Sequence, residues 1–221
     1  MTTAALRLVP ATLYCYLDPF GLALRLQSRP LPPALCQPPV PSRPVNAELS
    51  SLVGLFYGLP DGLGHFEKSL PEEVPGPYRK LLDHCHHMTV AMEEFYEGPV
   101  DVRVLGKKLD GNHYARRILL MRHSDRRVVQ FGIVRLNFDF LSDEVRREIE
   151  IQQTPLGRIL IRHNVMRKIE LIGLWRVQPG IDLCQMFGIA PQQTTYGRTA
   201  IIHCNCEPAV ELLEIAAPVD V

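Results

Sequence analysis

The stretch YARRILLMRHSDRRVVQFGIVRLNFDFLSDEVRREIEIQQTPLGRILI, residues 114–161, decides the fold of this chain. Two apolar segments at 114–121 and 128–137 flank a polar turn at His123 to Asp125, which predicts a β-hairpin. A helix is predicted over 142–152, with Ser142 as its N-cap because a side-chain oxygen there accepts from a free backbone amide. A Pro-Leu-Gly turn then begins a second helix over 155–163.

The same reasoning extends outward in both directions. Valines alternate with other residues over 99–105, which predicts a strand, and Asp110 to Asn112 form a turn before the hairpin. Short turns between consecutive strands indicate antiparallel pairing, so the fold class is α+β: a single six-stranded antiparallel sheet with helices packed on it. The remaining predicted strands are 167–177, 196–204 and 208–217, and the remaining predicted helices are 78–96 and 181–188.

Residues 1–77 differ in composition from the rest. They contain 13 of the 19 prolines, and proline is unfavourable inside helices and central strands. We therefore predict a poorly ordered N-terminal extension over 1–77, with a Pro-rich linker at 30–44, and a folded domain over 78–221. A short helix within 47–57 and a role as a lid or docking arm remain alternatives for this extension.

Composition excludes several classes of protein. The 24 basic and 24 acidic residues give a formal net charge of zero, which argues against a nucleic-acid binder driven by bulk charge. Six scattered cysteines show no disulfide framework and predict reduced thiols in a cytoplasmic protein. No apolar run approaches the ~20 residues of a membrane span, so we expect no membrane partner.

Four short motifs carry a resemblance: Arg-x-Ile-Leu-Leu at 116–120, Thr-Pro-Leu-Gly-Arg at 154–158, His-Met-Thr at 87–89 and Glu-Ile-Ala-Ala-Pro at 214–218. Together they resemble the chorismate pyruvate-lyase family over roughly residues 78–218. The resemblance implies a chorismate lyase-like fold and a lyase that cleaves chorismate to 4-hydroxybenzoate and pyruvate without a cofactor.

The resemblance also implies site residues. A guanidinium can grip a carboxylate with two parallel hydrogen bonds, so an arginine is expected as the clamp. Both faces of the 114–121 strand are apolar, so periodicity cannot choose between Arg116 and Arg117; the resemblance chooses Arg116. It also implies that backbone groups of Met88 and Leu156 help to bind the carboxylate.

Glu214 lies in an apolar strand, where a carboxylate is costly unless it is paired or useful. The resemblance gives it a catalytic role beside Arg116, as acid/base or hydroxyl anchor, with Glu211 on the opposite strand face as its rival. Arg198 is a candidate for gripping a second carboxylate.

Clusters that suggest a metal are incomplete. His84, His86 and His87 lie close together but without a recognised ligand pattern, and Cys204 with Cys206 form only a lone Cys-x-Cys. We therefore predict no metal and no cofactor.

Two other functions stay open beside the lyase. One is a non-catalytic binding module for a small aromatic carboxylic acid; the family is similar in shape to the effector-binding domains of GntR-like transcription regulators, which bind small acids without converting them. The other is a related enzyme that acts on another aromatic acid precursor. In each case the expected partner is a small molecule, not a nucleic acid.

Overall fold

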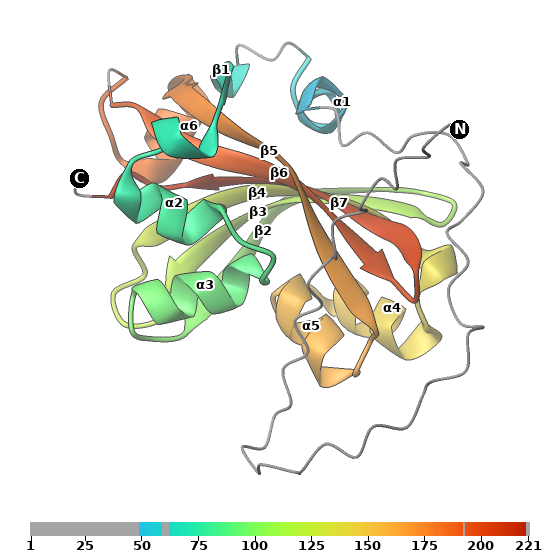
Figure 1. Ribbon diagram of the computed structural model, residues 1–221. Helices are drawn as coiled ribbons and strands as arrows, with labels where there is room; N and C mark the ends of the chain where they lie inside the picture. Colours follow the sequence, from blue (N-terminus) through green and yellow to red (C-terminus); the bar gives the residue numbers. More distant parts are fainter. Residues whose placement is uncertain (1–48, 59–61, 192, 220–221) are drawn as a thin grey trace, which may run out of the picture. The chain divides into compact units, whose positions relative to one another are not determined.

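A computed structural model describes residues 49–58, 62–191 and 193–219 (Figure 1). Its centre is one antiparallel sheet with helices on both faces, which confirms the predicted α+β class. The sheet has seven strands where six were predicted, in the order β1-β5-β6-β7-β4-β3-β2. The strands are β1 (Gly64–Ser69), β2 (Val100–Asp110), β3 (His113–Arg122), β4 (Val128–Asn137), β5 (Arg167–Pro179), β6 (Thr195–Cys204) and β7 (Glu207–Ala216).

The helices divide between the two faces of the sheet. Side chains alternate along a strand, so Ile118 and Leu120 of β3 face α2 to α5, whereas Leu119 and Met121 face α1 and α6. Buried apolar residues fill both layers, and the functional site lies in the first of them. The helices are α1 (Leu49–Gly54), α2 (Gly76–Leu82), α3 (Met88–Phe95), α4 (Asp143–Ile151), α5 (Leu156–Arg162) and α6 (Ile181–Phe187), with 3-10 turns at Pro71–Glu73 and Phe138–Phe140.

The segment that decides the fold forms as predicted. β3 and β4 pair as an antiparallel hairpin with Ile118 opposite Gly132. Ser142 caps α4, its hydroxyl accepting a hydrogen bond from the amide of Val145 at 3.5 Å. Gly111 has a φ of 57°, the left-handed conformation that the turn between β2 and β3 requires and glycine adopts without strain.

The predicted boundary after residue 77 needs correction. β1 pairs with β5, Gly64 lying opposite Pro179, and becomes an edge of the sheet. Leu52 and Val53 of α1 are fully buried against the second face. These apolar side chains complete a core that the strands alone leave open, so the domain includes the described residues 49–58 and 62–77. The predictions for residues 1–48, including the linker at 30–44, lie outside the described residues.

The predicted helix over 78–96 is two helices, α2 and α3, separated by residues 83–87. A continuous helix would use the main-chain carbonyls of this segment for its own hydrogen bonds. Instead, the carbonyls of Leu82, His84 and His86 accept hydrogen bonds from the side chain of Arg198 on β6. A contact from a strand more than a hundred residues away therefore interrupts the helical periodicity.

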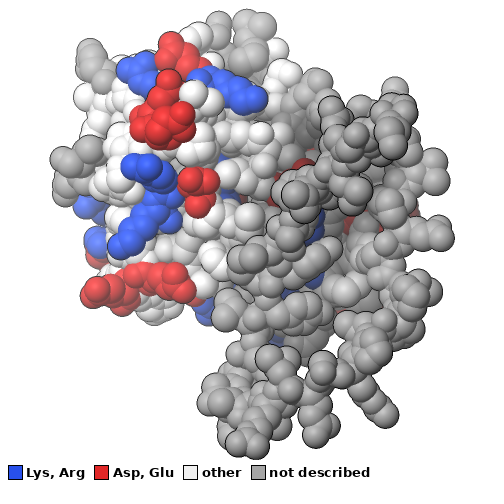
Figure 2. All heavy atoms as spheres, in the orientation of Figure 1, with Lys and Arg blue, Asp and Glu red and all other residues white. Residues whose placement is uncertain are grey.

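Surface charges agree with the zero net charge. On the visible part of the face in Figure 2, basic and acidic side chains of the described residues are interspersed. Among the helices that the structure describes, none is long and apolar enough to cross a membrane.

Candidate functional site

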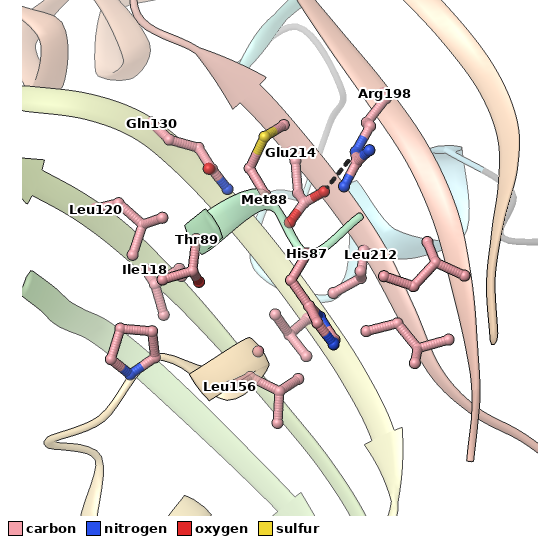
Figure 3. Close-up of a pocket in the computed structure, with 15 residues that line it drawn as sticks. His87, Met88, Thr89, Ile118, Leu120, Gln130, Leu156, Arg198, Leu212 and Glu214 are labelled. Carbon is pink, nitrogen blue, oxygen red and sulfur yellow. Dashed lines mark hydrogen bonds and ion pairs between the residues drawn. The ribbon is translucent and has the colours of Figure 1, made fainter. Parts of the chain in front are cut away.

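A small cavity of about 40 Å³ lies between the first face of the sheet and the N-terminal ends of α3 and α5 (Figure 3). Its walls are mostly aliphatic, with few polar side chains, which is the usual composition of a small-molecule site. Four of the five predicted site residues, Met88, Leu156, Arg198 and Glu214, line it. The complete lining is His87, Met88, Thr89, Ile118, Leu120, Gln130, Val134, Pro155, Leu156, Gly157, Ile169, Arg198, Ile202, Leu212 and Glu214.

Two helix starts form one wall of the cavity. Met88 is the first residue of α3 and Leu156 is the first residue of α5. The first amides of a helix have no partner inside the helix and favour negative charge. The two starts touch, because a Cβ atom at Gly157 would lie 3.0 Å from the side chain of His87. This contact closes the wall on one side.

Arg116, the predicted carboxylate clamp, is fully buried on β3. It faces the same layer as Ile118, and it lies opposite Val134, which lies opposite Leu212; all three neighbours line the cavity, although Arg116 itself does not. None of its three guanidinium nitrogens has a hydrogen-bond partner among the described residues. Arg116 is therefore a buried cation without a counter-ion beside the cavity.

Burial lowers the pKa of Arg116 from its ordinary value, because the charged form loses its water. The neighbouring Tyr114 opposes this shift, but its hydroxyl makes no hydrogen bond of normal geometry with the guanidinium. Arginine stays protonated in proteins even when its pKa falls. The positive charge of Arg116 therefore lies inside the protein without a hydrogen-bond partner among the described residues.

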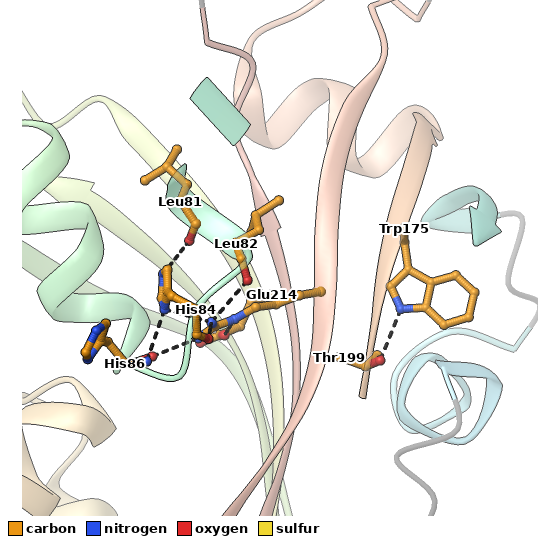
Figure 4. A network of polar contacts seen from close by, with 8 residues as sticks. Leu81, Leu82, His84, His86, Trp175, Thr199 and Glu214 are labelled. Atoms are coloured by element: carbon orange, nitrogen blue, oxygen red, sulfur yellow. Dashed lines mark hydrogen bonds and ion pairs between the residues drawn. The ribbon is translucent and has the colours of Figure 1, made fainter. Parts of the chain in front are cut away.

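Arg198 and Glu214 form a buried ion pair on adjacent strands, with 2.7 Å between Nε of Arg198 and Oε2 of Glu214. Their side chains are 1% and 10% exposed. The rest of the Arg198 guanidinium holds the segment between α2 and α3 (Figure 4). Nη1 contacts the carbonyls of Leu82 and His84 and the ring of His84, and Nη2 donates to the carbonyl of His86 at 3.1 Å.

This network bears on the predicted roles of both residues. Arg198 has five N–H donors, and its contacts with the described residues leave at most one of them free. Little therefore remains to grip a second carboxylate. The rival carboxylate, Glu211, lies on the opposite face of β7 and pairs with Arg135, whose Nε lies 2.8 Å from its Oε2. Glu214 thus faces the cavity and Glu211 does not.

Gln130 and His87 are polar residues of the cavity wall that were not predicted as site residues. Gln130 on β4 is 2% exposed, and its Oε1 has no hydrogen-bond partner among the described residues. His87, the N-cap of α3, accepts a hydrogen bond from Nε of Arg167 at 2.7 Å. A polar residue inside the apolar run of 128–137 was the available signal for Gln130. His87 stood in the His-Met-Thr motif and in the histidine cluster, but its contact with Arg167 comes from another part of the chain and had no local signal.

The pKa of His87 is lowered to about 3, first by burial and then by the charges of Arg167 and Arg198. The ring is therefore neutral at pH 7. The pKa of His84 is lowered to about 4 by burial and by Arg198. No group of three or more metal-ligating side chains occurs within the described residues. Burial also raises the pKa of the Cys204 thiol to about 11, which disfavours the thiolate that metals bind.

Acidification from pH 7 to pH 5 is expected to lower the free energy of unfolding by about 2 kcal/mol through His87. Between its unfolded pKa of 6.5 and its folded pKa of about 3, the unfolded chain binds the extra proton. Stability therefore rises with pH across this window and is level above it. Urea unfolding at both pH values measures the difference, and His87→Gln, which retains an acceptor for Arg167, should reduce it. An unchanged difference in that variant would show that His87 is not responsible.

Comparison with known proteins yields similarity of fold only. No family model and no curated protein matches the chain. PhnF from Mycobacterium smegmatis is 9% identical with a TM-score of 0.43; the match covers 58% of this chain and 62% of PhnF, less than two thirds of that protein. The ligand-binding domain of a protein assigned to the GntR family of transcriptional regulators in Bordetella bronchiseptica is 11% identical with a TM-score of 0.40, covering 55% and 92%. The C-terminal domain of histidine utilization repressor from Pseudomonas syringae is 11% identical with a TM-score of 0.39, covering 55% and 96%.

The predicted chorismate lyase-like fold is confirmed, with seven strands in place of six. The prediction of an enzyme is wrong: the similar structures include ligand-binding and C-terminal domains of transcriptional regulators. This finding overturns the prediction of a chorismate pyruvate-lyase. In the structure, the carboxylate chosen as acid/base is paired with Arg198.

Proposed function

We propose that this chain is a non-catalytic binding module for a small aromatic carboxylic acid, held in the cavity beneath α3 and α5. The observation that carries the proposal is the guanidinium of Arg116, fully buried beside the cavity and without a hydrogen-bond partner among the described residues. An isolated charge inside a protein costs several kcal/mol, and an anion that enters the cavity would remove much of that cost. The planar guanidinium suits a carboxylate, which accepts two parallel hydrogen bonds.

The helix starts in the cavity wall also favour an anion. Met88 begins the eight-residue helix α3, so its amide is free of helical partners and lies at the positive end of the helix. Leu156 at the start of α5 lies on the same wall. Arg116, Met88 and Leu156 together would surround a carboxylate from three elements of the fold.

The rest of the cavity favours an apolar body for the ligand. Ile118, Val134, Ile169, Ile202 and Leu212 come from five different strands and form an aliphatic floor. Burial of an aromatic ring against such a floor contributes roughly 25 cal/mol per Å² of apolar surface. An acid with one ring provides a carboxylate for the charge of Arg116 and an apolar ring to pack on this floor.

The ligand must open the site as it binds. A cavity of about 40 Å³ has room for about one water molecule, far less than the several hundred Å³ of an open pocket. The contact between His87 and Gly157 joins the two helix starts that close one wall. We propose that α3 and α5 separate at this contact when the acid enters.

Calorimetric titration of the full chain at pH 7 with benzoate and with benzamide tests the proposal. We expect benzoate to bind at least about tenfold more tightly, because only the carboxylate neutralises Arg116. Chorismate incubated with the chain should release no pyruvate. Equal affinity for the two ligands, absence of benzoate binding at millimolar concentration, or pyruvate release would each contradict the proposed function.

A further inference from the structure

Gln130 carries the second buried polar group of the site that has no hydrogen-bond partner in the described part of the chain, its Oε1 atom. Its side chain lines the cavity (Figure 3), it is 2% exposed, and Oε1 accepts no hydrogen bond from the described residues. Leaving such an acceptor without a donor is unfavourable, and buried amides nearly always have hydrogen-bond partners. The free acceptor Oε1 therefore points to a hydrogen-bond donor that arrives with the ligand.

The Gln130 side chain lies beside a neighbouring glycine, Gly132. A Cβ atom at Gly132 would lie 3.5 Å from Nε2 of Gln130 and 3.3 Å from Ile118. The distance to Nε2 is an ordinary van der Waals contact, so the amide of Gln130 lies beside this glycine in the cavity wall. Gly132 also lies directly opposite Glu214 on β7, so the amide extends on the same sheet face toward that carboxylate.

Glu214 provides a second acceptor near Gln130. Arg198 binds only Oε2 of this carboxylate, at 2.7 Å, and the described residues make no hydrogen bond to Oε1. Gln130 and Glu214 are diagonal neighbours on one face, a spacing that long side chains can bridge. Two acceptors are therefore available at one end of the cavity.

The anion site lies at the other end. Arg116 is opposite Val134 on β4, four residues from Gln130. Four residues along a strand span ~13 Å. Arg116 thus lies beside one end of the cavity floor and the two acceptors lie toward the other, with aliphatic side chains between them.

We infer that Gln130 is a specificity-determining residue that, together with Glu214, accepts a hydrogen bond from a hydroxyl or amino group of the ligand. The inference rests on the proposed function and narrows its ligand to an aromatic acid with a hydrogen-bond donor on the ring, remote from the carboxylate. Acids without that donor leave Oε1 of Gln130 unsatisfied and bind more weakly.

The test is a calorimetric titration of the full chain with benzoate, 3- and 4-hydroxybenzoate, 4-aminobenzoate and 4-methoxybenzoate. The wild-type chain should bind its preferred hydroxy or amino acid roughly tenfold more tightly than benzoate or the methoxy acid, which has only an acceptor. Gln130→Met, of similar length but apolar, should lose most of this preference. Gln185→Met, at an exposed position of α6, is the matched control and should leave the preference unchanged.

A ligand-free measurement accompanies the titration. If Oε1 of Gln130 has no partner in the folded chain, Gln130→Met should raise the thermal midpoint by about 2–4 °C, whereas an amide that stabilises the fold would give a lower midpoint. A lower midpoint, a retained preference in Gln130→Met, or equal wild-type affinities would overturn the inference while benzoate binding still supports the proposed function. Failure of every acid to bind the wild-type chain would contradict the proposed function and the inference with it.

Discussion

Replacing Arg198 with Met is expected to lower the free energy of unfolding by about 3–5 kcal/mol. The substitution leaves the carboxylate of Glu214 buried without its cation. It also removes the donor to the carbonyls of Leu82, His84 and His86, so the segment between α2 and α3 loses its attachment to β6. Urea unfolding followed by circular dichroism measures the change.

A matched control separates burial from charge. Arg176→Met removes the exposed pair of Arg176 with Glu67, with 2.9 Å between Nη1 and Oε2, and should cost less than about 1 kcal/mol. Adding Glu214→Gln to Arg198→Met should recover at least about 1 kcal/mol, because the stranded charge is then gone. Equal losses in Arg198→Met and Arg176→Met would show that the buried network does not support the fold.

Arg116→Met is expected to have the opposite effect on stability: the free energy of unfolding of the ligand-free chain rises by about 1–3 kcal/mol. Methionine has a similar length and removes a buried charge that no described group pairs with. Few buried arginines should behave in this way, since most are bonded. The same urea unfolding experiment detects the gain.

Arg117 provides the control because it is the next residue and faces the opposite layer. Its guanidinium lies 5.9 Å from the ring centre of Phe56 and 5.7 Å from that of Tyr57. Arg117→Met should therefore lose roughly 1 kcal/mol of stability through these cation–π contacts. A loss of stability in Arg116→Met as well would mean that its guanidinium has a partner in the folded chain.

Local sequence rules predicted much of the fold. The hairpin of β3 and β4 follows from two apolar runs around a polar turn, and Ser142 caps α4 as its position suggested. These features depend on residues close together in the chain. The antiparallel sheet follows from them, because short turns allow little else.

The errors come from contacts between distant residues. The prediction of one helix over 78–96 was wrong because Arg198 binds the carbonyls of residues 82–86. β1 was missed because its mixed polar sequence, GHFEKS, forms an edge strand against β5, where only one side is covered. Neither partner can be identified from a local pattern.

The site was only partly predictable. Strand parity could not choose between Arg116 and Arg117, and the resemblance selected the residue that proves to face the cavity layer. No local pattern indicated that Glu214 is paired with Arg198 or that Gln130 lacks a partner. The function was harder to predict, because the sequence alone does not show whether the Glu214 carboxylate is free or held in an ion pair.

The most direct test of the account is a titration of the wild-type chain, Arg116→Met and Arg117→Met with benzoate at pH 7 by calorimetry. If Arg116 is the carboxylate site, Arg116→Met loses about 100-fold or more in affinity, because it removes a buried charge-assisted contact. Arg117→Met, on the opposite face, stays within about threefold of the wild-type affinity. Wild-type affinity in Arg116→Met would contradict the central claim that this buried, unpartnered guanidinium binds the acid.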